Sequence, residues 1–220
     1  MKAYAGVGFK LDHHAEASMP AALQALLTAD EFYAVAGRKN DRFELVRGEV
    51  RPTRPTSGGH GTVSMNLVGR LWLYVDQHEL GQVFGDNVGF VLPLPPEMAR
   101  RSLDGELRDT VRSPDAAFVR RERIPAGGFG EGWVRLAPDF AVEVLSPDET
   151  ATETDEKLED YRAAGTALLW VVHPGRRRVT VHAAHAPTRW VHSGDTLDGG
   201  DVIPGFTIAV DVLFKNVPAR

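Results

Sequence analysis

The sequence predicts one α/β domain, in which helices flank a mixed β-sheet and additional antiparallel strands follow. Three observations favour this class: apolar residues recur at helical spacing in some segments, short apolar runs typical of strands separate them, and the 220-residue chain can bury one sizeable core. We expect an N-terminal arm at residues 1–27, the folded domain at residues 28–214 and a C-terminal tail at residues 215–220.

The domain is expected to open with a short helix and a β-hairpin. Thr28 is a typical N-cap residue and is soon followed by acidic residues, so a helix should begin there and end at Gly37. Residues 43–46 alternate as a strand does, and Arg47-Gly48 is typical of a tight turn. A second strand should therefore return from Glu49.

A long packed helix is expected after a Pro- and Gly-rich loop at residues 52–61. Apolar residues then recur at every fourth position, and two more widen the apolar face. These positions are Val63, Leu67, Leu71 and Val75, with Val68 and Trp72 beside them.

Short strands and one further helix account for the rest of the domain. Strands are expected at residues 81–86, 89–92, 114–119, 140–145 and 168–172, with antiparallel strands across residues 179–214. An acidic start and a glycine stop predict a helix at residues 153–164. The polar residues 97–112 are interpreted as a surface loop.

Composition excludes several classes of protein. The net charge of −5 argues against a protein that coats nucleic acid through a basic surface, and the lack of cysteine excludes disulfides and thiolate zinc sites. No apolar run could span a bilayer, and residues 1–20 lack the apolar core of a secretory signal, so we expect a cytoplasmic protein without a membrane partner. Any metal must then be held by carboxylates, carbonyls or imidazoles.

Asp115 and Glu143 each interrupt an apolar strand segment, where a charge is seldom placed without a partner. Asp139 shares a strand face with Glu143, but four residues of strand separate them by roughly 13 Å, too far to grip one ion. Neighbouring strands lie only about 4.8 Å apart, so Asp115 and Glu143 could share a hard cation. The alternative is that each carboxylate caps a strand or pairs with an arginine such as Arg112 or Arg135.

Lys157 lies on the expected helix after the strand of Glu143, and Tyr161 follows one turn later on the same face. A lysine directed into a carboxylate site can orient an attacking water or stabilise charge on a phosphate. The alternative is a solvated lysine that pairs with the acidic residues around it. His60, at the head of the long helix, could reach a phosphate or a metal-bound water, or make only a local hydrogen bond.

Five segments in this order resemble the Uma-type restriction endonuclease family of the PD-(D/E)XK nuclease superfamily. They are FELVRGEV at residues 43–50, SPDAAFV at residues 113–119, PDFAVEVLSP at residues 138–147, KLEDYRAAG at residues 157–165 and LWVVHP at residues 169–174. His60 adds to the likeness, which covers residues 28–214.

The resemblance implies a restriction-endonuclease-like core that hydrolyses DNA phosphodiester bonds, with Mg²⁺ or Mn²⁺ held by Asp115 and Glu143. It implies Glu44 as a further acidic catalytic residue, and a homodimer suited to cutting both strands of a duplex. The superfamily pattern places a lysine two residues after the second acidic residue, where this chain has Leu145. The resemblance implies that Lys157 supplies the amine instead.

Two other functions stay open at this point. A chain without the usual lysine and with a negative net charge could keep the fold as a non-catalytic binding or dimerisation module. A metal-dependent hydrolase of another phosphate or ester is the third reading, because a fold alone does not fix the substrate. The arginines within residues 120–123 and 176–178 could contact a phosphate backbone or form solvated turns.

Overall fold

The computed structural model describes residues 26–36, 43–53 and 56–218. The expected N-terminal arm lies outside these residues apart from its last two, and so does Gly37, the expected end of the first helix. Within the described ranges, no helix is both long and apolar enough to cross a membrane.

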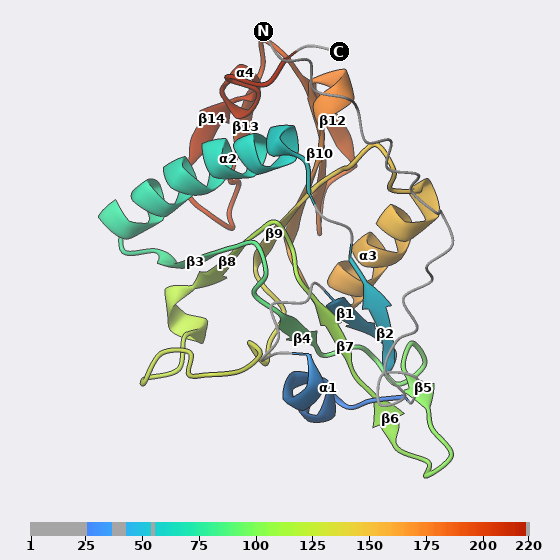
Figure 1. Ribbon diagram of the computed structural model, residues 1–220. Helices are drawn as coiled ribbons and strands as arrows, with labels where there is room; N and C mark the ends of the chain where they lie inside the picture. Colours follow the sequence, from blue (N-terminus) through green and yellow to red (C-terminus); the bar gives the residue numbers. More distant parts are fainter. Residues whose placement is uncertain (1–25, 37–42, 54–55, 219–220) are drawn as a thin grey trace, which may run out of the picture.

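A six-stranded mixed sheet forms the centre of the molecule (Figure 1). Its strand order is β12-β11-β10-β9-β8-β3, and only β9 and β10 run parallel. The strands are β3 (Gly81–Gly85), β8 (Ala116–Arg120), β9 (Phe140–Val144), β10 (Leu168–His173), β11 (Arg178–Ala183) and β12 (Arg189–His192). Helix α3 (Ala151–Ala163) makes the crossover that a parallel pair requires.

Helices cover both faces of this sheet (Figure 1). Helix α2 (Gly58–Gln77) packs residues such as Leu67 into a core with Trp170 on one face. Helix α3 packs Leu158 into a second core with Ala141 on the other face. All five residues of β9 are buried, so a charged side chain on that strand is largely removed from water.

A smaller antiparallel sheet, in the order β2-β1-β7-β4, packs with helix α1 (Ala29–Val35) in a third core. Its strands are β1 (Phe43–Val46), β2 (Glu49–Pro52), β4 (Phe90–Leu92) and β7 (Thr110–Arg112). Thr28 is the N-cap as predicted, and it forms a capping box: its side chain accepts from the Glu31 backbone N–H, and the Glu31 side chain accepts from the Thr28 backbone N–H. The predicted hairpin turn has positive φ at both Arg47 and Gly48, as a tight two-residue turn requires.

Short elements complete the chain. They are β5 (Arg100–Arg101), β6 (Leu107–Arg108), β13 (Thr196–Asp198), β14 (Thr207–Ala209) and α4 (Val210–Leu213), together with 3₁₀ turns at Arg121–Arg123 and Pro174–Arg176. The strands predicted at residues 81–86, 89–92, 114–119, 140–145 and 168–172 are all present within about two residues at their ends. The mixed α/β class is therefore confirmed.

The predictions of where the long helix begins and of Trp72 on its buried face were wrong. Helix α2 begins at Gly58, so the last part of the expected loop is helical. The Ser57 side chain accepts a hydrogen bond from the backbone N–H of His60 at 3.2 Å, and this N-cap offsets the weak helix propensity of the glycines. Trp72 does not widen the buried face, because 54% of it is exposed.

Residues 97–112 are not a plain surface loop, since they contain β5, β6 and β7. Arg112, in β7, is only 3% exposed, because two carboxylates from other elements neutralise its charge in the interior. The tail after residue 179 contains the expected antiparallel strands, but the short helix α4 follows the last of them.

Candidate metal centre

Asp115 and Glu143 meet at one end of the pair formed by β8 and β9. The register pairs Ala116 with Val142, and Asp115, which directly precedes β8, is hydrogen-bonded to the backbone on both sides of Glu143. The Asp115 backbone N–H donates to the Val142 carbonyl at 3.0 Å, and the Asp115 side chain accepts from the Val144 backbone N–H at 2.6 Å. Both side chains are buried, at 9% and 4% exposure, and their charges influence one another.

Glu143 receives hydrogen bonds from two residues of α3. Lys157 Nζ lies 3.0 Å from Glu143 Oε2, and the Tyr161 hydroxyl donates to Glu143 Oε1 at 2.9 Å. The two donors are four residues apart, so they project from the same face of the helix, as their sequence spacing predicted. Neither is a solvated surface residue, because Lys157 is only 18% exposed at its side chain and Tyr161 is fully buried.

Burial controls the protonation of Glu143. Removal from water raises its pKa to about 7, and the charges of Asp115 and Glu44 act in the same direction, whereas Lys157 lowers it. Carboxyl groups whose pKa is shifted to near 7 are common in functional sites.

Lys157 stays cationic in this setting. Burial lowers its pKa, but the negative charges of Glu143, Glu44 and Glu149 raise it by more, and the net shift is upward. Glu149 Oε1 lies 3.2 Å from Nζ and holds the amine from its other side. A permanently charged amine can stabilise negative charge on a phosphate but cannot remove a proton from water.

Asp115 is held by groups from two elements. Its Oδ2 accepts a hydrogen bond from the Val144 backbone N–H at 2.6 Å, and its Oδ1 lies 3.2 Å from His60 Nε2. Burial lowers the pKa of His60, but Asp115 and the Val144 carbonyl raise it by more, so the net shift is upward. The arginines considered as partners in the sequence, Arg112 and Arg135, bind other carboxylates.

Glu44 lies beside the centre rather than between its two main carboxylates. It accepts hydrogen bonds from Arg112 Nη1 at 2.9 Å and from the Ser113 backbone at 3.0 Å. Burial raises its pKa, but Arg112 and Lys157 lower it by more, so it is held ionised. Its charge reaches both Glu143 and Lys157.

A buried ion-pair network fixes α3 against the smaller sheet. Arg112 binds Asp160 through Nε at 2.9 Å and Nη2 at 2.6 Å, and Arg47 binds the other oxygen of Asp160 at 2.8 Å. Arg47 and Arg51 also bind Glu156 on the same helix. Because Glu156 and Asp160 flank Lys157 along α3, this network sets the position of the amine.

Asp139 belongs to the opposite end of β9. It accepts from the Arg120 backbone at 2.9 Å and pairs with Arg123 at 2.8 Å. Arg121 reaches Glu79 instead. The arginine group at residues 120–123 is therefore largely engaged by protein carboxylates.

Sequence reasoning missed two residues that shape this centre, Asp160 and Glu149, and it named the buried Arg112 only as a possible partner of Asp115 or Glu143. Asp160 offered a usable signal, because it lies three residues after Lys157, on the helix face that carries Tyr161. The true partners of Arg112 could not be predicted locally, since Glu44 and Asp160 are 68 and 48 residues away in the chain.

The donor set suits a small divalent cation. No group of three or more His, Cys, Asp or Glu side chains within the described residues is arranged to hold a metal ion. Mg²⁺, however, usually takes one or two carboxylates and completes its shell with waters and substrate phosphates. A carboxylate has about four acceptor positions. Asp115 and Glu143 each use two of these positions, so both can still ligate an ion.

A mixed sheet covered by helices on both faces, with acidic residues at adjoining strand ends, defines the α/β class of this protein. The family model described as "Putative restriction endonuclease", Uma2, matches residues 29–211. The chain therefore belongs to the Uma2 family, which confirms the resemblance seen in its sequence.

A solved structure has the same fold. It is described as a "putative nuclease belonging to DUF820" from Anabaena variabilis ATCC 29413, and it matches with a TM-score of 0.69 at 19% sequence identity. The match covers 86% of this chain and 98% of that one. No curated protein matches the sequence.

Proposed function

We propose that this protein is an endonuclease that hydrolyses DNA phosphodiester bonds with Mg²⁺ or Mn²⁺ held by Asp115 and Glu143. The observation that supports the proposal is that Asp115 is hydrogen-bonded to the backbone N–H next to Glu143, with a lysine amine 3.0 Å from Glu143 itself. A divalent cation bound there would lower the pKa of a bound water and offset charge on the phosphate.

The remaining residues have supporting roles in this proposal. Lys157 supplies a fixed positive charge beside the scissile phosphate, which favours a transition state with added negative charge. Tyr161 holds the second oxygen of Glu143, and His60 holds Asp115. Glu44 is a supporting acidic residue, since its own oxygens are bound to Arg112 and Ser113.

A cleavage assay tests this function. Purified protein is incubated with plasmid DNA in Mg²⁺, in Mn²⁺ and in EDTA, and cleavage is expected only with a metal. Asp115→Asn and Glu143→Gln should each lower the rate by about a hundredfold or more, since each removes one charged ligand while keeping its shape. Glu159→Gln, on the exposed side of α3, is the matched control. Unchanged cleavage in the first two variants would refute the assignment.

A non-catalytic binding module is the second candidate, favoured by one specific observation. Leu145, at the position where the superfamily pattern has lysine, packs against the second core. Calorimetry with Mn²⁺ and with a DNA duplex separates the candidates. DNA binding without metal binding or cleavage would favour the module, whereas Mn²⁺ binding that Glu143→Gln abolishes would support the nuclease.

The proposal extends to the assembly and its location. A homodimer would place two such centres on the two strands of a duplex, with a two-fold axis relating them. We propose that it acts on DNA in the cytoplasm.

A further inference from the structure

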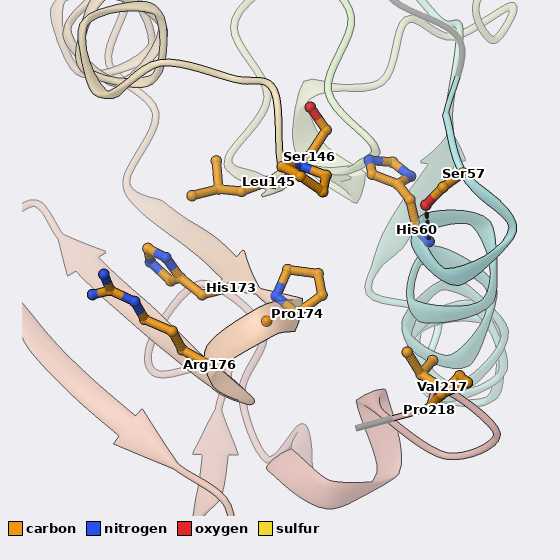
Figure 2. A pocket seen from close by; sticks show the side chains of 11 residues that line it. Ser57, His60, Leu145, Ser146, His173, Pro174, Arg176, Val217 and Pro218 are labelled. Atoms are coloured by element: carbon orange, nitrogen blue, oxygen red, sulfur yellow. Dashed lines mark hydrogen bonds between the residues drawn. The ribbon is translucent and has the colours of Figure 1, made fainter. Parts of the chain in front are cut away.

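A pocket of about 210 Å³ adjoins the candidate metal centre on the side of α2. Figure 2 shows Ser57 and His60 on one side of it and His173 and Arg176 on the other. Leu145 lies in the wall between these two sides. Neither the family description nor the proposed reaction assigns a role to this pocket.

His60 connects the pocket with the metal centre. One ring nitrogen, Nε2, lies 3.2 Å from Asp115, and the ring lines the pocket. The other ring nitrogen, Nδ1, is buried and lacks a well-formed hydrogen bond. The Val144 carbonyl also acts on the ring, so His60 is held against the metal centre while its ring forms part of the pocket wall.

The far side of the pocket carries an arginine that has no ion pair with any described residue. Of the three consecutive arginines, Arg177 lies over the ring of Phe214 and Arg178 lies over the ring of Trp190. Arg176 instead lines the pocket, at the end of the 3₁₀ turn Pro174–Arg176. An arginine in such a position binds phosphate oxygens well, often through two hydrogen bonds.

The first turn of α2 adds a partial positive charge on the His60 side. Gly61 N–H makes the first bond within the helix, to Ser57, so the N–H groups of Gly58 and Gly59 precede it. Neither glycine carries a side chain that would cover them, and the helix dipole favours an anion there. Between the two polar ends, Pro147, Pro174 and Val217 give the pocket an apolar surface.

We propose that this pocket binds the nucleotide next to the scissile phosphate. The strand would run from the metal centre past His60, with the sugar and base against the apolar wall and the flanking phosphate against Arg176. This inference rests on the proposed function for its substrate, but it assigns a separate subsite. A mononucleotide fits the combination of an apolar surface and a phosphate-binding arginine better than inorganic phosphate does.

Calorimetry on the full chain in EDTA tests the subsite without catalysis. The probes are thymidine 5′-monophosphate, thymidine and inorganic phosphate, and we expect the monophosphate to bind most tightly. Arg176→Ala should weaken its binding by about tenfold, as expected for the loss of a charged hydrogen-bond donor. Arg121→Ala, an exposed arginine that pairs with Glu79, is the matched control and should change nothing. Glu143→Gln should also keep nucleotide binding, because Glu143 does not line the pocket.

The same variants in the cleavage assay separate this inference from the proposed function. Arg176→Ala should raise KM for an oligonucleotide more than it lowers kcat. If the protein cuts no DNA but binds the nucleotide in a way that depends on Arg176, the subsite proposal is supported and the proposed nuclease function is refuted. If the protein cleaves DNA but Arg176→Ala changes neither nucleotide binding nor KM, the subsite proposal is wrong and the proposed nuclease function stands. Equal affinities for phosphate and the monophosphate would also overturn it.

Discussion

Two opposing influences set the pKa of Glu143. Burial and neighbouring carboxylates favour its neutral form, whereas Lys157 favours its ionised form, and the balance places its pKa at about 7. A bound divalent cation would act in the same direction as the lysine. In the proposed site, the charge state of this one carboxyl group would therefore be linked to metal binding.

The first prediction follows from that linkage. Below about pH 7 a metal ion must displace a proton from Glu143, so the apparent affinity for Mn²⁺ should fall by up to about tenfold for each pH unit and level off above pH 7. Calorimetric titrations between about pH 5.5 and pH 8 measure this dependence. Glu159→Gln should show the same profile, and a flat profile for the unmodified protein would contradict the assigned ligand.

The second prediction concerns the amine. Lys157→Met removes the charge that lowers the pKa of Glu143, so the midpoint of the pH profile should move upward by about one unit or more, and kcat should fall. Lys215→Met, at an exposed lysine near the C-terminus, is the control for the loss of a positive charge. An unmoved midpoint would mean that Lys157 does not govern the ionisation of Glu143.

Helix α3 is the element on which the centre depends most. It contributes Lys157 and Tyr161 to Glu143, and it is fixed to the smaller sheet by Arg112 through Asp160. Both Arg112 and Asp160 are almost completely buried, so their charges need the partners within this network, which include Glu44 and Arg47.

The third prediction tests this attachment. Arg112→Met leaves the buried Glu44 without its arginine and leaves Asp160 with Arg47 alone, and we expect a loss of about 3–5 kcal/mol in the free energy of unfolding. Urea denaturation measures the loss. Arg100→Met is the comparison, because Arg100 pairs with Glu49 at the surface and should cost at most about 1 kcal/mol. Equal effects of the two substitutions would show that the buried network does not hold α3.

At the scale of the whole molecule, much of the architecture could be predicted from local pattern. The apolar periodicity of α2 and the short apolar strands around Asp115 and Glu143 reflect burial on known faces, and the sequence carries that information directly. Asp115 and Glu143 were found because each breaks such a pattern. The partners of Arg112 and the pocket were missed because they bring together segments distant in sequence.

The fourth prediction also belongs to this scale. Sedimentation should give a particle of twice the 24.1 kDa chain mass, and plasmid DNA should be linearised as well as nicked, since two centres would act on opposite strands. A monomer that only nicks would contradict the proposed homodimer while leaving the metal centre unaffected.

One hydrogen bond connects Asp115 to the strand that carries Glu143. Asp115 Oδ2 is tied to the peptide nitrogen that directly follows Glu143, so neither carboxylate can shift without carrying the other strand with it. In the proposed metal site, lengthening one side chain would not widen the space between Asp115 and Glu143 for a bigger ion such as Ca²⁺. Retuning the cation preference would demand coordinated redesign of both strand ends.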